Sequence, residues 1–538
     1  MIEVDIMKAI LVGINSKYIH PNLAIRLLKK NTDYLVSIKE FTIKDELTKI
    51  IEYLKDYEII AFSCYIWNIG LIKKILPFLV KNHTIILGGP EVSYNANYYL
   101  ENDLAHYVIK NEGEEAFDLL LKYLDGKITI DKVPNLYHKN GFTFDKLVDI
   151  SKIKMAYDLL DDVKNKIVYI ETSRGCPYKC AYCMASLDNK VRFFDIKEIK
   201  YQIKTLIDKD ARVFKFLDRT FNANKKNFIE LIDFIILHHK ENNSFQFEIT
   251  GDLLSPEIID YINQKAPKKL FRFEIGIQST NIETNLSVGR IQNNEKLFSN
   301  IIKIQNAGVI DLHLDLIAGL PYEDYHSFEK TFNEVVNLKP KELQLGFLKL
   351  LYGTKMYTDA KKYQYIWQDE APYEVISNQF LSELDIKEIH DAEDAFEYYY
   401  NSSFMPNVMS LIIDYEESPF TFFNKLGKKD FKGHGLENAF KVFDDFILGK
   451  DYYQELHETL IVDYLNYYQI KPKAWWDEHC SKEEKNVFLR RLDELSLLPI
   501  KLVDAYKYSL VVKMQNCYIL AIYQQGKKEI IKYEKSLI

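Results

Sequence analysis

Three cysteines stand close together in the stretch ETSRGCPYKCAYCMAS, residues 171–186. They are Cys176, Cys180 and Cys183, with the spacing C-x3-C-x2-C. An odd number of closely spaced cysteines argues against a disulfide framework. A zinc site needs four ligands, and no histidine follows at the spacing of a zinc half-site. The other cysteines stand alone in the sequence, at Cys64, Cys480 and Cys517. Three thiolates on one loop can instead hold three corners of a four-iron cluster and leave the fourth iron open to a chelating ligand.

The residues upstream of this loop alternate short β-branched runs with longer helical patterns. Strands are predicted at KAILVGI, YLVSIKEFT, EIIAFSCYI, TIILGGPE and HYVIKNEG, and helices at NLAIRLLKK, DELTKIIEYL, GLIKKILPFLV and EEAFDLLLKYL, all within residues 8–125. Alternation at this spacing predicts right-handed crossovers and a parallel, doubly wound, Rossmann-like sheet. Ligands bind such a sheet beyond the carboxyl ends of its strands, so the loops there are candidate binding segments. These loops are residues 13–22, 63–68, 88–93 and 111–115.

A second series of strands begins immediately before the cysteines. Its members are KIVYIET, RVFKFLD, FQFEIT, LFRFEIGIQ, LHLDLIAGL and LQLGFLKLL, across roughly residues 166–350. Six strand-helix units are too few for a closed eight-fold barrel. The pattern therefore predicts a partial (β/α)6 TIM barrel, open on one side, with its site at the carboxyl ends of the strands.

These patterns divide the chain into four parts. We predict a sheet domain over residues 1–130, a connector over 131–165, a partial barrel over 166–355 and a mainly helical carboxyl-terminal domain over 356–538. The last part ends in short strands after Tyr506, and we expect it to cover the barrel mouth, because reactive sites are closed to water. Its aromatic stripe EDAFEYYYNSSFMP is read as helix core rather than as a substrate channel.

Composition limits the classes of protein that remain. With 47% hydrophobic and 28% charged residues, the 538-residue chain has an ordinary soluble composition. The sequence has no run of about 18 uncharged apolar residues, so it predicts no membrane-spanning helix. The opening residues lack the pattern of a secretory signal, so we expect a cytoplasmic location. A net charge of −8 gives no overall reason to expect nucleic acid as a partner.

The cysteine loop and the strand ends together resemble the radical S-adenosylmethionine (radical SAM) superfamily, over roughly residues 166–350. Gly175, Pro177 and Tyr182 surround the cysteines as in the superfamily's loop. The fourth strand, FEIGIQST, resembles the superfamily's E-x-G-x-Q-S element. The resemblance implies a [4Fe-4S] cluster on the three cysteines, with S-adenosylmethionine on the open iron.

The same resemblance assigns candidate contacts to S-adenosylmethionine. They are Tyr182 near the adenine, Asp218 at the methionine amine, Glu274, Gln278 and Ser279 along the ribose and methionine, and Arg290 at the methionine carboxylate. Asp218 stands in FLDRTFN, where the superfamily's Gly-Gly-Glu is replaced. Arg290 suits a carboxylate because a guanidinium can donate two parallel hydrogen bonds to it. In the alternative, Glu274 and Arg290 form a structural ion pair. Glu248 and Asp315 either point into the barrel mouth or cap strand ends.

The sheet domain resembles the cobalamin-binding class of the same superfamily. The matching pieces are LGGPEVS, the loop after FSC, and IKNEGEEAF. From these pieces, the candidate cobalamin contacts are Ser63, Gly88, Gly89 and Gly113. Paired glycines after a strand fit a plain tight turn equally well. The first loop, GINSKYIHPN, lacks the D-x-H-x-x-G motif that supplies an imidazole to cobalt, so His20 is read as a loop or helix-capping residue.

These resemblances imply a function. In the leading interpretation the chain is an enzyme that generates a 5′-deoxyadenosyl radical and acts as a cobalamin-dependent methyltransferase, on a substrate that the sequence does not disclose. The alternative is a radical SAM rearrangement, ring-forming or sulfur-inserting enzyme without bound cobalamin. A redox sensor would leave Glu274, Gln278 and Arg290 without a role. The implied partner is an electron donor such as flavodoxin or ferredoxin. The carboxyl-terminal part resembles an uncharacterised, DUF4080-like extension of cobalamin-type radical proteins.

Overall fold

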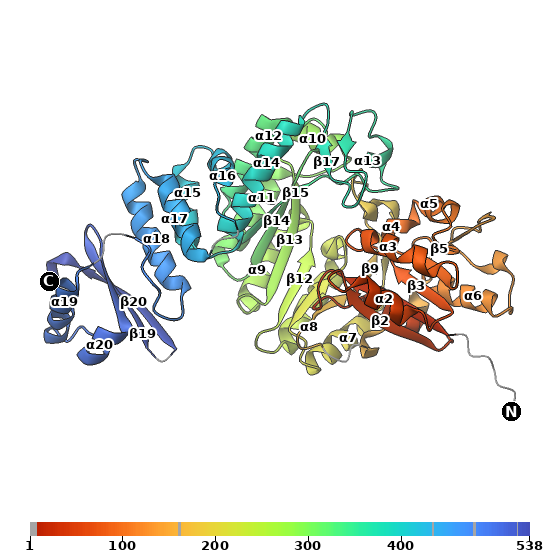
Figure 1. Cartoon of the computed structure of the whole chain (residues 1–538), viewed down its shortest axis with the longest axis horizontal. Coiled ribbons are helices and arrows are strands. Elements are labelled where there is room, and N and C mark those ends of the chain that lie inside the picture. Colours follow the sequence, from red (N-terminus) through yellow and green to blue (C-terminus); the bar gives the residue numbers. More distant parts are fainter. Residues whose placement is uncertain (1–7, 160–162, 433–434, 477–479, 525, 538) are drawn as a thin grey trace. The chain divides into compact units, whose positions relative to one another are not determined.

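The computed structural model describes residues 8–159, 163–432, 435–476, 480–524 and 526–537 (Figure 1). The chain forms two compact units. The first comprises Met1–Phe328 and Gln344–Glu383, and the second comprises Glu329–Leu343 and Leu384–Ile538. In the described ranges, no helix is long and apolar enough to cross a membrane.

The amino-terminal part is the predicted doubly wound sheet. Its parallel strands are β1 (Ala9–Asn15), β2 (Val36–Thr42), β3 (Ile59–Ser63), β4 (Thr84–Gly88) and β5 (Tyr107–Ile109). The strand order is β2-β1-β3-β4-β5-β6-β7, in which β6 (Leu136–His138) and β7 (Gly141–Phe142) are antiparallel. Residues predicted as a connector therefore extend this sheet. The order reverses between β1 and β3, so the loops after these two strands flank the crevice where ligands bind such sheets.

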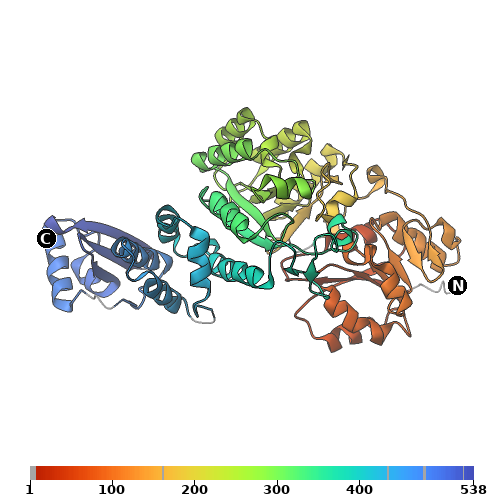
Figure 2. The same cartoon turned by 90° about the horizontal axis from the view of Figure 1, so that it is seen from above.

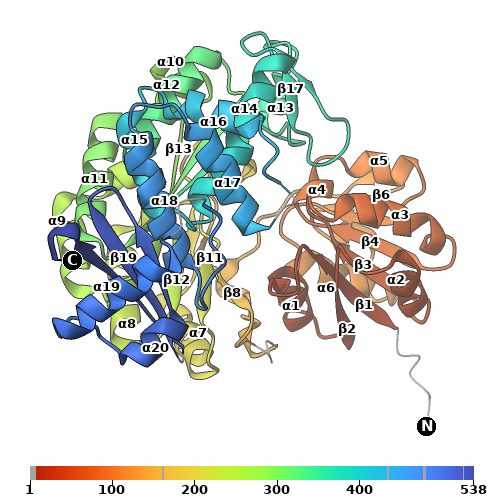
Figure 3. The ribbon, with the colours of Figure 1, turned by 60° about the vertical axis from the view of Figure 1, so that its left-hand side comes forward.

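Helices cover both faces of this sheet, which explains why its strands read as continuous apolar runs. They are α1 (Leu23–Lys30), α2 (Leu47–Leu54), α3 (Ile69–Leu79), α4 (Pro90–Ser93), α5 (Ala96–Glu101) and α6 (Glu114–Leu124). Along β1, Ile10 and Val12 pack with α2 and α3, whereas Ala9 and Leu11 pack with α1 and α6 (Figure 3). Successive side chains of a strand alternate between faces, so one strand serves both cores.

The predicted six barrel strands are confirmed. They are β8 (Ile167–Ile170), β11 (Val213–Phe216), β12 (Ser244–Glu248), β13 (Phe271–Gln278), β14 (Asp311–Ala318) and β15 (Glu342–Phe347), in the order β15-β14-β13-β12-β11-β8. The helices between them are α7 (Ile196–Asp208), α8 (Lys225–His238), α9 (Pro256–Lys265), α10 (Ile282–Ser287), α11 (Asn294–Ala307) and α12 (Tyr325–Val336). Buried phenylalanines such as Phe245 and Phe273 alternate with partly buried polar residues such as Gln246 and Glu274. The polar set therefore lines the inside of the barrel.

A segment after β15, residues 348–382, belongs to the first unit although we predicted its greater part as carboxyl-terminal domain. It holds α13 (Lys355–Thr358), β16 (Ile366–Trp367) and β17 (Val375–Ser377). Leu348 N donates to Ala318 O over 2.9 Å, and Tyr365 OH donates to Gly319 O over 2.7 Å. These bonds fix the segment at the carboxyl end of β14.

The second unit is mainly helical and ends in strands, as predicted. Its helices are α14 (Glu383–Phe396), α15 (Pro406–Tyr415), α16 (Pro419–Gly427), α17 (Leu436–Ile447), α18 (Tyr453–Tyr467), α19 (Lys482–Glu494) and α20 (Leu502–Tyr508). The antiparallel strands β18 (Ser509–Lys513), β19 (Cys517–Gln524) and β20 (Lys527–Glu534) share a core with α19 and α20 (dark blue in Figure 2). Tyr399 and Phe443 are fully buried with ring centroids 5.4 Å apart, so the aromatic stripe is core. That this unit covers the barrel mouth stays a prediction.

Candidate cluster and cofactor site

The cysteine loop is closed at its neck by a short antiparallel ribbon. Strands β9 (Ser173–Arg174) and β10 (Arg192–Phe193) pair so that Arg174 lies opposite Arg192. Cys176 N donates to Asp188 O over 2.9 Å inside the neck. Gly175 has φ +87°, and a Cβ there would lie 2.5 Å from Lys190 O. Only glycine fits this crossing, which explains its place before the first cysteine.

This one loop carries all three cysteines. Cys176 and Cys180 are buried and Cys183 is partly buried. Burial raises the pKa of Cys183, the charge of Arg219 lowers it, and the thiols of Cys180 and Cys176 raise it further. The described residues contain no group of histidine, cysteine, aspartate or glutamate side chains arranged to hold a single metal ion. Three thiols carried by one loop suit a cluster, whose irons occupy separate corners.

Two backbone bonds hold the loop between its second and third cysteines. Ala181 N donates to Val288 O, and Met356 N donates to Ala181 O, each over 2.8 Å. Val288 ends α10, and Met356 lies in α13 of the segment 348–382. No sequence signal pointed to Met356, because a backbone donor carries no motif.

Tyr182 and Arg290 lie together beside the cysteines, at the end of β13. Arg290 Nη1 lies 3.5 Å from Tyr182 OH, Nη2 donates to Gly276 O, and Nε donates to Gln292 Oε1 over 3.1 Å. The register of β13 shifts between Gly276 and Gln278, where Gln278 has φ +68°. Gln278 Oε1 is buried with no hydrogen-bond partner among the described residues. A bulge and an unsatisfied acceptor at a strand end are features of ligand sites.

Paired charges occupy the inside of the barrel. Lys215 donates to Glu274 over 3.3 Å, whereas Arg290 donates to Gly276 O and Gln292 Oε1, so these bonds do not support the alternative of a Glu274–Arg290 ion pair. Arg219 donates to Glu248 over 3.2 Å. Glu248 lies at an inward position of β12, and burial raises the pKa of its carboxyl.

Asp315 lies on the same inner surface, from β14. His313 Nε2 is 3.0 Å from Asp315 Oδ1, and burial raises the pKa of Asp315. Glu248 and Asp315 therefore face the interior rather than cap their strands.

Two predicted cofactor contacts have their oxygens engaged by the protein. Asp218 accepts from Thr172 N (3.0 Å), Thr172 Oγ1 (2.6 Å) and Ser173 Oγ (2.5 Å), and burial raises its pKa to about 6. Ser279 is fully buried and donates to Glu323 over 2.5 Å. These bonds favour a role in positioning the loop and strand end, and direct contact with the cofactor stays a prediction.

His20 lies against the barrel rather than in the crevice of the sheet. Its Nδ1 is 2.6 Å from Tyr169 OH, and the neighbouring Ile19 O accepts from Ile167 N over 2.9 Å. The loop after β1 thus packs along β8, and burial lowers the pKa of His20. This agrees with the interpretation of His20 as a loop residue.

Among the candidate cobalamin contacts of the sheet domain, three have structural roles and one has free space beside it. Ser63 Oγ accepts from Asn22 Nδ2 over 2.7 Å, and a Cβ on Gly113 would lie 3.2 Å from Leu28 Cδ2. Gly89 has φ +112°, and a Cβ there would lie 2.5 Å from Cys64 O, so the turn itself requires glycine. At Gly88 the nearest atom to such a Cβ is 3.8 Å away, which leaves ordinary contact space.

An aromatic pair that the sequence analysis missed stands at the end of β3. Trp67 is 47% exposed, and its ring stacks on Tyr65 with centroids 4.4 Å apart. Trp67 Nε1 donates to Ile14 O over 3.2 Å, so the carboxyl end of β1 holds the indole. An exposed, immobilised indole beside the crevice offers a flat apolar surface to a ligand. Its position in the loop 63–68, a candidate binding segment, was the sequence signal that could have identified it.

Three family models match the chain. They are the B12 binding domain over residues 10–121, the Radical SAM superfamily over residues 170–335, and the Protein of unknown function (DUF4080) over residues 361–531. The fold and the site thus define a radical SAM protein with an amino-terminal B12-binding domain. A region that matches the DUF4080 model follows these two domains in the chain.

Curated relatives match at low identity. The 2-(S-pantetheinyl)-carbapenam-3-carboxylate methyltransferase of Streptantibioticus cattleyicolor is 20% identical over 51% of this chain and 44% of its own. The cobalamin-dependent radical SAM methyltransferase TokK of Streptomyces tokunonensis is 20% identical over 57% of this chain and 49% of its own. The chain therefore spans less than half the length of these relatives.

Solved structures share the fold. OxsB with aqua-cobalamin and S-adenosylmethionine bound has a TM-score of 0.60 at 16% identity, over 86% of this chain and 79% of that one. TsrM from Kitasatospora setae, with cobalamin and a [4Fe-4S] cluster bound, has a TM-score of 0.57 at 13% identity, over 85% and 99%.

Proposed function

We propose that the chain is a cobalamin-dependent radical SAM methyltransferase. The observation that carries this proposal is the position of three thiols on one loop after β8, in the same compact unit as a doubly wound sheet with an exposed indole at its ligand edge. Together, a four-iron cluster, S-adenosylmethionine and cobalamin supply a substrate radical and a methyl group when bound.

The residues of the barrel fit the first two groups. Cys176, Cys180 and Cys183 would hold the cluster. Arg290 would bind the methionine carboxylate, and Gln278 Oε1 would accept a hydrogen bond from an amine or hydroxyl of the ligand. Tyr182, buried next to Cys180 and Arg290, would exclude water from that side of the ligand.

Two features at the ligand edge of the sheet favour a large flat ligand. Trp67 supplies an apolar surface, and Gly88 leaves the backbone accessible. His20 is bonded to Tyr169, so this chain would bind cobalamin without an imidazole from that loop. The proposal includes an electron donor such as flavodoxin or ferredoxin and a reducing, cytoplasmic setting for the thiols.

Anaerobic reconstitution tests the cluster. Wild-type protein is expected to hold about four irons per chain and to form 5′-deoxyadenosine with a reductant. The triple variant C176A/C180A/C183A should lose both properties, and C480A, which removes a cysteine of the second unit, should keep them. Retention of iron and activity by the triple variant would overturn the assignment of the cluster.

Hydroxocobalamin binding tests the methyltransferase. About one equivalent per chain should co-purify, and its spectrum should lack a histidine nitrogen on cobalt. Trp67→Ala should weaken binding of the corrinoid. Phe78→Ala is the control, because Phe78 is an aromatic residue of α3 that is 63% exposed, and this variant should bind the corrinoid as the wild type does. If the wild-type protein holds an intact cluster but has no affinity for the corrinoid, the methyltransferase proposal is wrong. The alternative, a radical SAM enzyme without bound cobalamin, then takes its place.

A further inference from the structure

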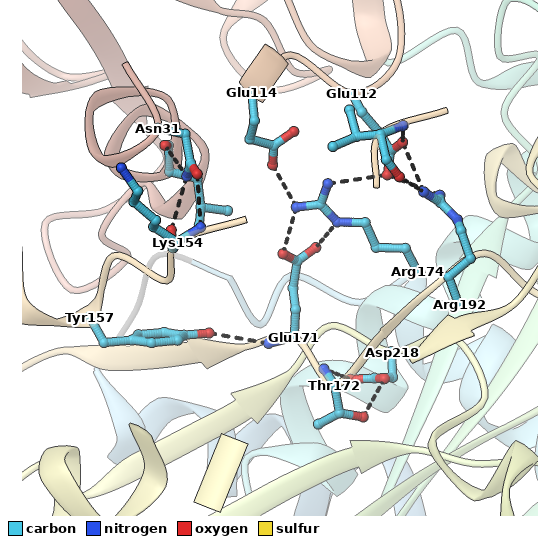
Figure 4. A network of polar contacts seen from close by, with 12 residues as sticks. Asn31, Glu112, Glu114, Lys154, Tyr157, Glu171, Thr172, Arg174, Arg192 and Asp218 are labelled. Atoms are coloured by element: carbon cyan, nitrogen blue, oxygen red, sulfur yellow. Dashed lines mark hydrogen bonds and ion pairs between the residues drawn. The ribbon is translucent and has the colours of Figure 1, made fainter. Parts of the chain in front are cut away.

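Two arginines stand at the neck of the cysteine loop and reach out of the barrel into the sheet domain (Figure 4). Arg174 precedes Gly175 and Cys176 directly, and Arg192 lies opposite it in the β9–β10 ribbon. Because the ribbon closes the loop, the position of these two residues sets the position of the cysteines.

Arg174 binds glutamates from both domains. Its Nη1 donates to Glu112 over 3.1 Å and its Nη2 to Glu114 over 2.6 Å. On the barrel side, Nη2 also donates to Glu171 over 3.0 Å. The guanidinium therefore bridges the end of β8 and the sheet domain with its donors in a fixed plane.

Arg192 reinforces the same bridge. It donates from both Nη atoms to Glu112, over 3.0 and 2.9 Å, and to Asp188 over 2.6 Å. The side chains of Arg174, Arg192 and Glu112 are only 11–13% exposed. Burial acts to raise the pKa of Glu112, but the bond from Arg192 and the charge of Arg174 outweigh it and hold that pKa below its ordinary value. Charges buried to this extent are tightly constrained, because losing one partner leaves the other uncompensated.

The glutamates lie at the ligand edge of the sheet. Glu112 stands between β5 and α6, and Glu114 is the first residue of α6. The backbone N–H of the adjacent Asn111 donates to Ser93 Oγ over 3.0 Å, which ties this loop to the segment 88–93. A continuous set of bonds thus runs from the glycine turn of the sheet domain to the neck of the cysteine loop.

We propose that Arg174 is a positioning residue that couples the ligand site of the sheet domain to the cysteine loop, so that a corrinoid bound at one changes the environment of the cluster at the other. This inference rests on the proposed function. Coupling between two sites is reciprocal. If the cluster changes the affinity for the corrinoid by a given factor, the corrinoid changes the affinity for the cluster by the same factor. Arg174 is suited to this role because it is bonded to both domains at once.

The test measures the dissociation constant of hydroxocobalamin with and without the reconstituted cluster. In the wild type these two constants should differ on the order of fivefold or more. In Arg174→Gln the ratio should fall to about one, while the three cysteines still hold iron. Arg174→Lys keeps the charge but not the planar fork, so it should restore only part of the ratio. The electron paramagnetic resonance (EPR) spectrum of the reduced cluster should shift on corrinoid binding in the wild type and not in Arg174→Gln.

Arg26→Gln is the matched control. Arg26 is a buried arginine of the sheet domain that pairs with Glu40 over 2.5 Å, and both residues belong to that domain. This variant loses a comparable ion pair, so a ratio like that of the wild type would exclude a general effect of destabilisation. If Arg174→Gln fails to fold, Glu114→Gln removes one contact from the sheet side and takes its place.

A wild-type ratio near one, or an unchanged ratio in Arg174→Gln, would overturn the coupling. If the wild type binds no corrinoid, the proposed function fails first, and the cluster then provides a separate test. In that case the EPR spectrum of Arg174→Gln should still differ from that of Arg26→Gln. Identical spectra would overturn the positioning role of Arg174 as well.

Discussion

Replacing Gly175 by alanine should release the cluster without unfolding the barrel. The new Cβ would lie 2.5 Å from Lys190 O and 3.0 Å from Asp188 O, at φ +87°. A left-handed backbone costs a non-glycine residue about 1–2 kcal/mol. To reach even 3.0 Å from Lys190 O, the two backbone segments must separate by about 0.5 Å, the difference between 3.0 and 2.5 Å.

This separation acts on the hydrogen bond from Cys176 N to Asp188 O at the same neck. Loss of that bond adds about 1 kcal/mol, so the total cost of the variant is about 2–3 kcal/mol. The cost falls on the loop that carries the cysteines. We therefore expect fewer than four irons per chain after reconstitution.

Gly308→Ala is the control for backbone strain alone. Gly308 ends α11 with φ +61°, and a Cβ there would meet nothing within 4 Å. It should lose about 1–2 kcal/mol of unfolding free energy and keep its iron. Iron content and urea unfolding measured on both variants decide the matter. If Gly175→Ala holds as much iron as Gly308→Ala, the neck does not set the position of the cysteines.

Three further predictions concern single side chains. The pKa of Asp218 is raised to about 6 by burial, so its protonated form is favoured in the fold and its contribution to stability falls as pH rises through 6. Relative to Asp218→Asn, the wild type should lose about 1 kcal/mol of unfolding free energy between pH 5 and 7.5, measured by urea titration, and parallel pH profiles would contradict this. Gln278→Ala removes a buried acceptor that lacks a partner among the described residues, so it should weaken S-adenosylmethionine binding in calorimetry with little loss of stability, and unchanged affinity would exclude Gln278 from the site. Tyr373→Phe leaves the buried carboxylate of Glu91 without its donor and should lower the free energy of unfolding by about 1.5–3 kcal/mol. The control Tyr365→Phe loses only a bond to a neutral carbonyl and should lose less. Equal losses of unfolding free energy in the two variants would argue against a charged Glu91.

The sequence predicted those features that depend on local pattern. Apolar runs and helical periods located β1 and β13, because period and burial are properties of consecutive residues. Parallel sheets then followed from the alternation of strands and helices. The spacing of Cys176, Cys180 and Cys183 selected the class of cofactor, since three thiols on one loop suit few metal groups.

Roles that depend on packing were beyond the sequence. Gly89 matched a cobalamin motif, but it is required by the close approach of Cys64, a contact across two strands. Asp218 stood at the expected strand end, yet its oxygens accept bonds from Thr172 and Ser173, which lie more than 40 residues away in the chain. A strand-end position indicates which edge a residue occupies and leaves its hydrogen-bond partners open.

Contacts between distant segments were decided by the tertiary structure alone. Met356 supports the cysteine loop through its backbone, and Arg174 meets Glu112 across 62 positions of sequence. Neither pairing leaves a local signal, because a hydrogen bond between domains depends on how the two surfaces dock and not on the neighbours of either residue. The sequence by itself therefore determined the cysteines, the strands and the class of chemistry. The packing of the sheet domain against the barrel determined which side chains hold the cysteine loop in place.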